Sequence, residues 1–195
     1  MGEWKKTDNH APERKLALRR YFLDKYHNAT PPRVFDGFQG SGLLWSELRK
    51  SHAVKSYWGV DLKPKKGRLK IDSMRVLDQP GWAFDVVDLD AYGSPWKHWW
   101  ALQRNLRGPV TVFLTVGSAG FGRQDRSALS ACGLGGLNIP IGMHAALRDF
   151  ISETCVQTAL YGVSIVEIVE SKNPGGNARY FGVRLEKATI NAQKD

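Results

Sequence analysis

The chain has 195 residues, of which 42% are hydrophobic and 11% aromatic, including seven Trp. This length and composition suit one compact domain and argue against disorder over the whole chain. No stretch approaches the roughly 18 apolar residues of a membrane span, and the polar N-terminus lacks the apolar segment of a secretory signal. We therefore expect one soluble, cytoplasmic domain over residues 1–195 that does not engage a membrane, with flexible ends at 1–12 and 188–195.

Basic residues are in excess, because Lys and Arg outnumber Asp and Glu by 28 to 19 and give a formal net charge of +9. Such an excess favours a polyanionic partner, although a merely solubilising surface is about equally compatible with the charge alone. Part of the excess is clustered in two groups: Arg14, Lys15, Arg19, Arg20 and Lys25, and Lys63, Lys65, Lys66, Arg68 and Lys70. The clustering favours nucleic acid as the partner.

Apolar periodicity and turn residues predict helices and strands in alternation along the chain. The first helix, over 13–26 and opened by Pro12, is expected to be basic and amphipathic. Its apolar stripe should comprise Leu18, Tyr21, Phe22 and Tyr26. Further helices are expected at 43–51, 96–106 and 144–160, and strands at 33–36, 57–61, 69–72, 83–89, 110–116, 163–169 and 179–185.

Strands separated by helices predict an α/β fold with a mostly parallel sheet and helices on both faces. The last two strands flank Asn173-Pro174-Gly175-Gly176, which predicts a C-terminal antiparallel hairpin. In outline this order resembles the Rossmann-like seven-stranded methyltransferase sheet. Residues 117–140, rich in Gly and Ser, are expected to form a long mobile loop that is either functional or disordered. Cys132 and Cys155 lack the CxxC spacing of a zinc or redox site, so we assign them no role and expect no metal.

A glycine-rich turn follows the first predicted strand, where residues 36–42 read Asp-Gly-Phe-Gln-Gly-Ser-Gly. Such a turn lets backbone N–H groups approach a ligand at the carboxyl end of the sheet. Trp45 stands where a nicotinamide fingerprint needs its third glycine, which makes a nicotinamide oxidoreductase the least favoured alternative. The segment resembles the D-x-F-x-G-x-G first motif of S-adenosylmethionine-dependent methyltransferases. That resemblance implies S-adenosylmethionine as the cofactor and places four residues at it: Asp36, Phe38, Gly40 and Gly42.

Acidic residues end the next two predicted strands. Asp61 lies about 20 residues beyond the turn, the separation at which a carboxylate reaches the ribose hydroxyls of a bound cofactor. Pro64 and the lack of an immediate helix weaken the alternative that Asp61 caps a helix. Asp72 falls where the resemblance implies a contact with the exocyclic amine of adenine, although an Asp before Ser73 can equally cap a helix. With the acidic end of the fourth strand, the order of these residues is hard to explain by chance.

The exit of the fourth predicted strand carries the most informative motif, because residues 85–96 read Asp-Val-Val-Asp-Leu-Asp-Ala-Tyr-Gly-Ser-Pro-Trp. This segment resembles the D-x-D-P-[FY]-G-[ST]-P loop of the tRNA guanine N2-dimethyltransferases, with Ala91 where that family has Pro. The order of motifs agrees over residues 33–116. The resemblance does not extend to the family's N-terminal Asn-Arg-Asp element or its C-terminal RNA-binding domain, so the tRNA position does not transfer. It implies methylation of an exocyclic amino group of a nucleic-acid base, with RNA favoured over DNA.

The chemistry of such a transfer assigns roles within this loop. An exocyclic amine is a poor nucleophile, and a carboxylate that accepts its hydrogens turns its lone pair toward the methyl group. We expect Asp90 to be this acceptor and the proton sink, with an Asx turn as the alternative. Tyr92 could stack on a flipped base. Asp88 either shares the catalytic role or faces the cofactor, and the sequence does not divide the two roles.

Substrate contacts are expected just after the catalytic loop and in the glycine-rich segment. The residues assigned to them are Gly93, Ser94, Pro95, Trp96, Lys97 and Arg123. The aromatic residues at 96–100 could form a stacking wall beside a nucleotide or pack the helix onto the sheet, and we expect one or two of the Trp to be core. Arg123 and Arg126 could grip phosphates or could be solvated charges on a loop.

Two other functions remain open from the sequence. A DNA amino-methyltransferase would share most of these features, but its usual D-P-P-[YFW] loop is replaced by Asp90-Ala91-Tyr92-Gly93. A nucleic-acid-binding module on a methyltransferase fold that no longer catalyses is the other alternative. The glycine turn together with Asp61 argues against the second, because a module without a cofactor does not need them.

Overall fold

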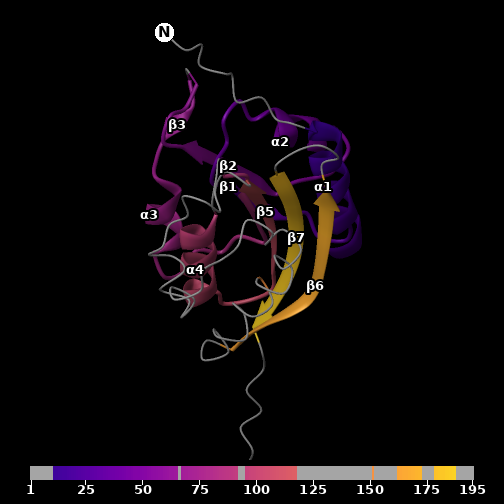
Figure 1. Ribbon diagram of the computed structural model, residues 1–195, viewed down its shortest axis with the longest axis vertical. Helices are drawn as coiled ribbons and strands as arrows, with labels where there is room; N and C mark the ends of the chain where they lie inside the picture. The colour runs from indigo at the N-terminus through magenta and orange to yellow at the C-terminus, as the bar shows by residue number, and fades with distance from the viewer. Residues whose placement is uncertain are drawn as a thin grey trace, which may run out of the picture.

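The computed structural model describes residues 11–65, 67–91, 95–117, 151, 162–172 and 178–187. The described strands are β1 (Arg33–Asp36), β2 (Ser56–Asp61), β3 (Leu69–Lys70), β4 (Val86–Leu89), β5 (Val110–Gly117), β6 (Val163–Lys172) and β7 (Ala178–Lys187). The described helices are α1 (Pro12–Tyr26), α2 (Leu43–Leu48), α3 (Ser73–Leu77) and α4 (Trp96–Asn105). All seven strands form one sheet in the order β3-β2-β1-β4-β5-β7-β6 (Figure 1).

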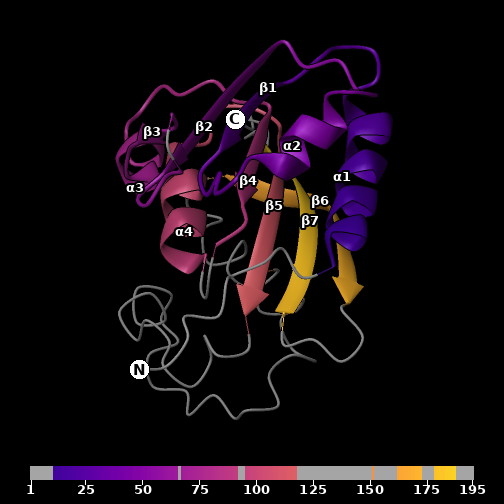
Figure 2. The same cartoon turned by 90° about the horizontal axis from the view of Figure 1, so that it is seen from above.

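The first five strands pair in parallel, and β7 is antiparallel to both β5 and β6. The predicted mostly parallel sheet with a C-terminal antiparallel hairpin is therefore confirmed. Helices α1 and α2 lie on one side of the sheet and α3 and α4 on the other (Figure 2). The carboxyl ends of β1, β2 and β4 consequently meet at one edge, where loops rather than helices follow each strand.

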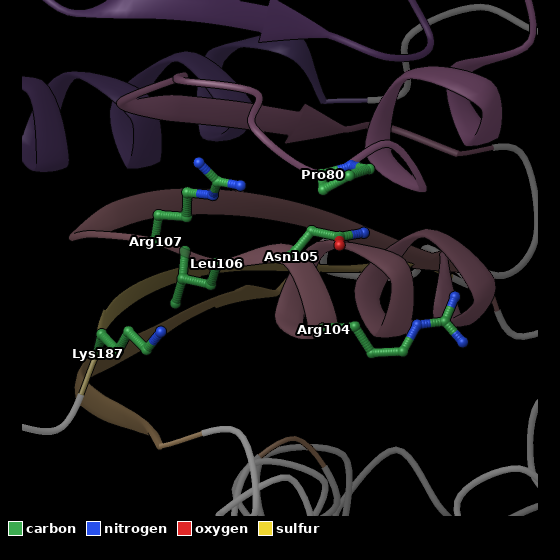
Figure 3. Close-up of a pocket in the computed structure, with 6 residues that line it drawn as sticks. All are labelled: Pro80, Arg104, Asn105, Leu106, Arg107 and Lys187. Atoms are coloured by element: carbon green, nitrogen blue, oxygen red, sulfur yellow. The ribbon is translucent and has the colours of Figure 1, made fainter. Parts of the chain in front are cut away.

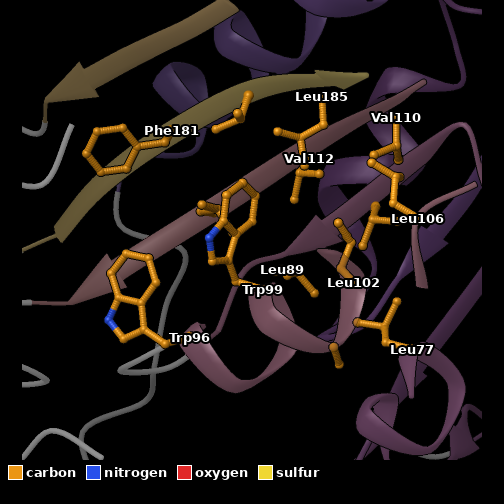
Figure 4. Packing of buried hydrophobic residues seen from close by; sticks show 14 of the residues in the cluster. Leu77, Leu89, Trp96, Trp99, Leu102, Leu106, Val110, Val112, Phe181 and Leu185 are labelled. Carbon is orange, nitrogen blue, oxygen red and sulfur yellow. The ribbon is translucent and has the colours of Figure 1, made fainter. Parts of the chain in front are cut away.

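Two apolar cores fill the layers, because alternate strand residues point to opposite faces of the sheet. Val34 and Val86 pack with α1 and α2, whereas Phe35 and Val87 pack in the larger core beside α4. In that larger core, side chains of α4 face those of β5 and β7, as Figure 4 shows.

Several predicted elements differ in extent. Helix α3 was not predicted as an element, although the alternative that Asp72 caps a helix anticipated it. The strand expected at 83–89 begins only at Val86, and Phe84 before it stacks on Phe35 with ring centroids 4.9 Å apart. β3 has only two residues, and α2 ends at Leu48 before a series of turns.

Other predictions concern residues that the structure does not describe. The loop expected at 117–140 lies outside the described residues except for Gly117, which ends β5. The helix expected at 144–160 lies outside them except for Ile151, a buried helical residue. Both cysteines and the expected flexible ends also lie outside, apart from Ala11 and Pro12 at the start of α1.

Helix α1 buries a face that overlaps the predicted stripe, since Leu18 and Phe22 are buried and Tyr26 packs partly buried against the core. Its buried residues are Lys15, Leu18, Arg19, Phe22 and Leu23, a spacing of i, i+3, i+4, i+7 and i+8. Tyr21, expected in the apolar stripe, is 43% exposed. The buried stripe thus contains two cations, Lys15 and Arg19, that were expected on the basic surface.

None of the helices in the described part of the chain is long and apolar enough to cross a membrane. Over the same residues, no three His, Cys, Asp or Glu side chains are grouped so that they could hold a metal ion.

Candidate functional site

The glycine turn crosses the carboxyl edge of the sheet and is fixed to both neighbouring strands. The N–H of Gly37 donates to the carbonyl of Asp88 at 3.0 Å, and the N–H of Gln39 donates to the carbonyl of Val60 at 3.0 Å. Gly40 and Gly42 have φ angles of 51° and 68°, which favour glycine. The turn therefore lies over the ends of β4 and β2, where parallel α/β sheets bind ligands.

Asp61 joins this turn from the end of β2, as the sequence order predicted. Its Oδ2 accepts the N–H of Gly40 at 2.9 Å and its Oδ1 accepts the N–H of Lys63 at 2.7 Å. A carboxylate has about four acceptor sites in all. Asp61 therefore keeps capacity for two hydroxyl donors while it also holds the turn in place.

A cavity of about 330 Å³ adjoins the ends of β2 and β3. Its lining residues are Leu62, Lys70, Ile71, Asp72 and Arg75. Asp72 Oδ1 accepts the N–H of Met74 at 2.9 Å, so the helix-capping role left open by the sequence is present. The exposed Leu62 and the partly buried Ile71 give this cavity apolar walls suited to a flat ring.

Phe38, in the glycine turn, contacts the half-buried His98 of α4 with ring centroids 4.7 Å apart. His98 Nε2 is 2.9 Å from the hydroxyl of Ser73. Burial lowers the pKa of His98 to about 4, with Lys97 also lowering it and Asp72 opposing, so the ring is neutral at neutral pH. Its Nδ1 is buried and has no hydrogen-bond partner among the described residues. The neutral His98 ring therefore links α4 to the glycine turn and to the start of α3.

Asp88, at the carboxyl end of β4, is held by two residues from the opposite helical layer. Arg19 donates to both of its oxygens at 2.7 Å, and the indole N–H of Trp45 donates to Oδ2 at 2.7 Å. Its side chain and that of Arg19 are each 2% exposed. The structure therefore favours an anchoring role for Asp88 over direct contact with a substrate or cofactor.

Asp90 lies just beyond β4 and is the more accessible of the two, with 12% of its side chain exposed. Lys15 donates to its oxygens at 2.6 and 2.7 Å, and the ammonium lies 5.0 Å from the centre of the Tyr180 ring. Burial of Asp90 opposes its ionisation, but attraction to Lys15 and Arg19 and hydrogen bonds from Lys15 and Thr115 lower its pKa overall. Asp90 is consequently a charged hydrogen-bond acceptor at neutral pH.

The remaining expected site residues are divided between core and surface. Trp96 is fully buried and packs α4 onto the sheet, so it presents no face to a nucleotide. Pro95 precedes α4 and is buried, while Lys97 is exposed. The others lie outside the described residues: Tyr92, Gly93, Ser94, Arg123 and Arg126.

A second cavity, of about 190 Å³, lies near the start of β5 and the end of β7, away from these carboxylates (Figure 3). Its lining residues are Pro80, Arg104, Asn105, Leu106, Arg107 and Lys187. None of the expected site residues that the structure describes lines it.

Sequence reasoning missed the two cations that contact the acidic residues of β4. Lys15 and Arg19 lie one helical turn apart, at positions that the pattern of Leu18 and Phe22 assigns to the buried face. The position of these two cations on the apolar face was the sequence signal that could have identified them. A basic residue at a buried helical position requires an acidic partner, and the chain offers acidic strand ends.

No family model matches the sequence, and no curated protein does. Among solved structures, Trm1 from Pyrococcus horikoshii with S-adenosyl-L-methionine has a TM-score of 0.61 at 16% identity, over 90% of this chain and 56% of that chain. TYW2 from M. jannaschii in complex with AdoMet has a TM-score of 0.53 at 14% identity, over 95% and 79%. The plantazolicin methyltransferase BamL, with a triazolic desmethylPZN analog and SAH, has a TM-score of 0.53 at 13% identity, over 92% and 86%. The chain thus spans little more than half of the Trm1 chain, and it has the Rossmann-like methyltransferase fold.

Proposed function

We propose that the chain is an S-adenosylmethionine-dependent methyltransferase that acts on an exocyclic amino group of a nucleic-acid base, with RNA, and tRNA guanine in particular, as the favoured substrate. The observation that carries the proposal is the position of Asp90. It is a charged carboxylate at the end of β4, beside a glycine turn that Asp61 holds at the end of β2. Two neighbours of the same fold carry this cofactor in their structures, which supports the choice of methyl donor.

The described residues fit the cofactor. The glycine turn of residues 37–42 is suited to its methionine part, and Asp61 has acceptor sites left for the ribose hydroxyls. The cavity lined by Leu62, Ile71 and Asp72 is suited to adenine. When bound, the cofactor supplies a methyl group on a sulfonium, which is open to in-line displacement.

The residues of this chain then position the acceptor. Asp90 accepts the hydrogens of the amine, which directs the nitrogen lone pair away from the carboxylate and toward the methyl group. A methylated amine of a base is strongly acidic while it still carries its extra proton, so even a carboxylate with a lowered pKa takes that proton. Lys15 keeps Asp90 ionised and in place. The pair thus favours hydrogen-bond orientation over strong general-base catalysis.

The functional test is a cofactor titration followed by a transfer screen. S-adenosylmethionine should bind in calorimetry, and tritium from a labelled donor should appear in tRNA or another RNA. Absence of binding at millimolar cofactor would favour the non-catalytic nucleic-acid-binding module. Transfer to DNA alone would favour the DNA amino-methyltransferase, and transfer to protein alone would contradict a nucleic-acid substrate.

Asp61→Ala should weaken S-adenosylmethionine binding at least about tenfold, since it removes charge-assisted hydrogen bonds worth about 1.5 to 3 kcal/mol. The variant also frees the N–H of Gly40, so part of the loss comes from a looser turn. Asp24→Ala, at an exposed carboxylate that contacts only His52 among the described residues, is the control. Unchanged affinity in a folded Asp61→Ala protein would show that a residue other than Asp61 contacts the ribose.

Binding of the nucleic-acid substrate should weaken with salt, but by less than the full basic clusters imply. Lys15 and Arg19 form ion pairs with buried carboxylates, and Lys25 forms one with Glu167, so these three cations do not neutralise phosphates. Of the two basic clusters, the described residues that remain exposed and outside these pairs are Arg14, Arg20, Lys63, Lys65, Arg68 and Lys70. If about three phosphates are neutralised, affinity for single-stranded RNA should fall roughly 20-fold between about 50 and 200 mM salt.

A charge-reversal variant tests whether the nucleic acid contacts the cations that follow β2. Lys63→Glu with Lys65→Glu should weaken binding and flatten the salt dependence, whereas Lys55→Glu, at the far end of β2, should leave both unchanged. Affinity of the wild-type protein that does not vary with salt would argue for a protein or small-molecule acceptor.

A further inference from the structure

Three carboxylates gather at the ends of β1 and β4, and two cations of α1 accompany them. Asp36 and Asp88 are register partners on adjacent strands, and Asp90 follows two residues later. Arg19 binds both oxygens of Asp88, and Lys15 binds both oxygens of Asp90. Among the described residues, Asp36 therefore has no cation of its own.

The direct partners of Asp36 are neutral. The hydroxyl of Tyr57 donates to it at 2.8 Å, and the N–H of Phe38 donates at 3.3 Å. Asp36 is only 4% exposed, so water replaces neither partner. On its other side, Tyr57 accepts the amide N–H of Gln39 at 3.1 Å and lies under the guanidinium of Arg49, 4.7 Å from the ring centre.

Charged residues of α1 and at the end of β4 also affect the pKa of Asp36. Burial and repulsion by Asp88 raise the pKa of Asp36 to about 8, with Asp90 adding to the repulsion. The hydrogen bond from Tyr57 and the attraction of Arg19 lower it by less. A protonated Asp36 therefore adds no further negative charge to the two ion pairs, Arg19 with Asp88 and Lys15 with Asp90.

We propose that Asp36 senses the charge of the bound cofactor: it keeps its proton in the free protein and in the complex with the neutral thioether product, and releases it to solvent when the sulfonium donor binds. This inference rests on the function proposed above. Asp36 begins the glycine turn that we assign to the cofactor, and a cation in a poorly hydrated site favours the ionised carboxylate. The thioether brings no such charge. Only the O–H bond of Asp36 changes.

The pH dependence follows from the proton balance. Donor binding that expels a proton strengthens as pH rises, from the pKa of Asp36 in the donor complex up to its pKa of about 8 in the free protein. Above about pH 8 no proton remains to be released, and the affinity levels off. Donor and product share the same amino and carboxyl groups, but the sulfonium lowers the pKa of the donor's amine, so the affinity ratio in Asp36→Asn supplies the pH dependence of the ligands themselves as a baseline.

The experiment is calorimetric titration of the full chain with S-adenosylmethionine and with S-adenosylhomocysteine across this pH range. The donor-to-product affinity ratio should rise about tenfold between about pH 6 and pH 8 and stay constant above. In Asp36→Asn, which keeps an acceptor but cannot titrate, this rise should be absent and only the pH dependence of the ligands themselves should remain. In Tyr57→Phe, which removes a hydrogen bond to the ionised form, the rise should move to higher pH.

A constant ratio in the wild type, or an unchanged rise in Asp36→Asn, would overturn the inference while the methyltransferase function stands. If Asp36→Asn does not fold, titrations of the wild type in two buffers of different ionisation enthalpy count the protons directly. At neutral pH the donor should then release about half to one proton more than the product, and equal release overturns the inference. Failure of both ligands to bind overturns the proposed function itself.

Discussion

Asp90→Asn should lower the single-turnover rate of methyl transfer by about two to four orders of magnitude, while affinity for S-adenosylmethionine changes little. Asparagine preserves the shape of the loop and one acceptor oxygen, but it loses the charge that attracts the hydrogens of the amine and takes the proton. It also leaves Lys15 facing a neutral amide, so a modest loss of stability should accompany the loss of rate. Rapid-quench kinetics and a cofactor titration measure the two quantities separately.

Asp85→Asn is the matched control. Asp85 lies just before the same strand, at its opposite end, and pairs with Arg33 at 2.9 Å much as Asp90 pairs with Lys15. Its replacement should leave the rate near that of the wild type. An Asp90→Asn protein with a near-normal rate would restrict Asp90 to an Asx turn or to anchoring Lys15, because asparagine serves an Asx turn about as well.

Arg19→Met should reduce the free energy of unfolding by about 3 to 5 kcal/mol, the usual cost of leaving one charge of a buried pair without its partner. Arg19 and Asp88 are each 2% exposed, so water cannot replace the guanidinium. Methionine fills most of the volume against Phe113, whose ring lies 4.9 Å from the guanidinium carbon. Urea unfolding followed by circular dichroism measures the change.

Two further variants separate the buried charge from lost packing. Arg19→Met combined with Asp88→Asn should recover part of the stability, because the amide still accepts from Trp45 but carries no charge. Arg104→Met, at a pair in which both side chains are about half exposed, should cost less than about 1 kcal/mol. A loss for Arg19→Met as small as that for Arg104→Met would show that the Arg19 pair is hydrated in solution.

Local patterns were sufficient to predict the sheet. Continuous apolar runs such as 110–116 and the turn at residues 37–42 specify strands and their ends without long-range information, whereas the register of Asp36 with Asp88 depends on pairing between distant strands and was not predicted. Short elements were harder, because α3 has five residues and little room for periodicity. The apolar residues Leu18 and Phe22 indicated the buried face of α1, but the cations on that face were missed because their burial depends on pairing with distant carboxylates.

The docking of α1 also depends on the C-terminal part of the chain, which is synthesised last. Tyr21, Lys25 and Tyr26 all donate to Glu167 of β6, which is 141 to 146 residues further along the sequence. Contacts of such separation close late in folding. During synthesis, a ribosome-bound chain that lacks β6 therefore holds α1 without these three hydrogen bonds, through its contacts with β4 and the earlier strands, until the C-terminal hairpin is made.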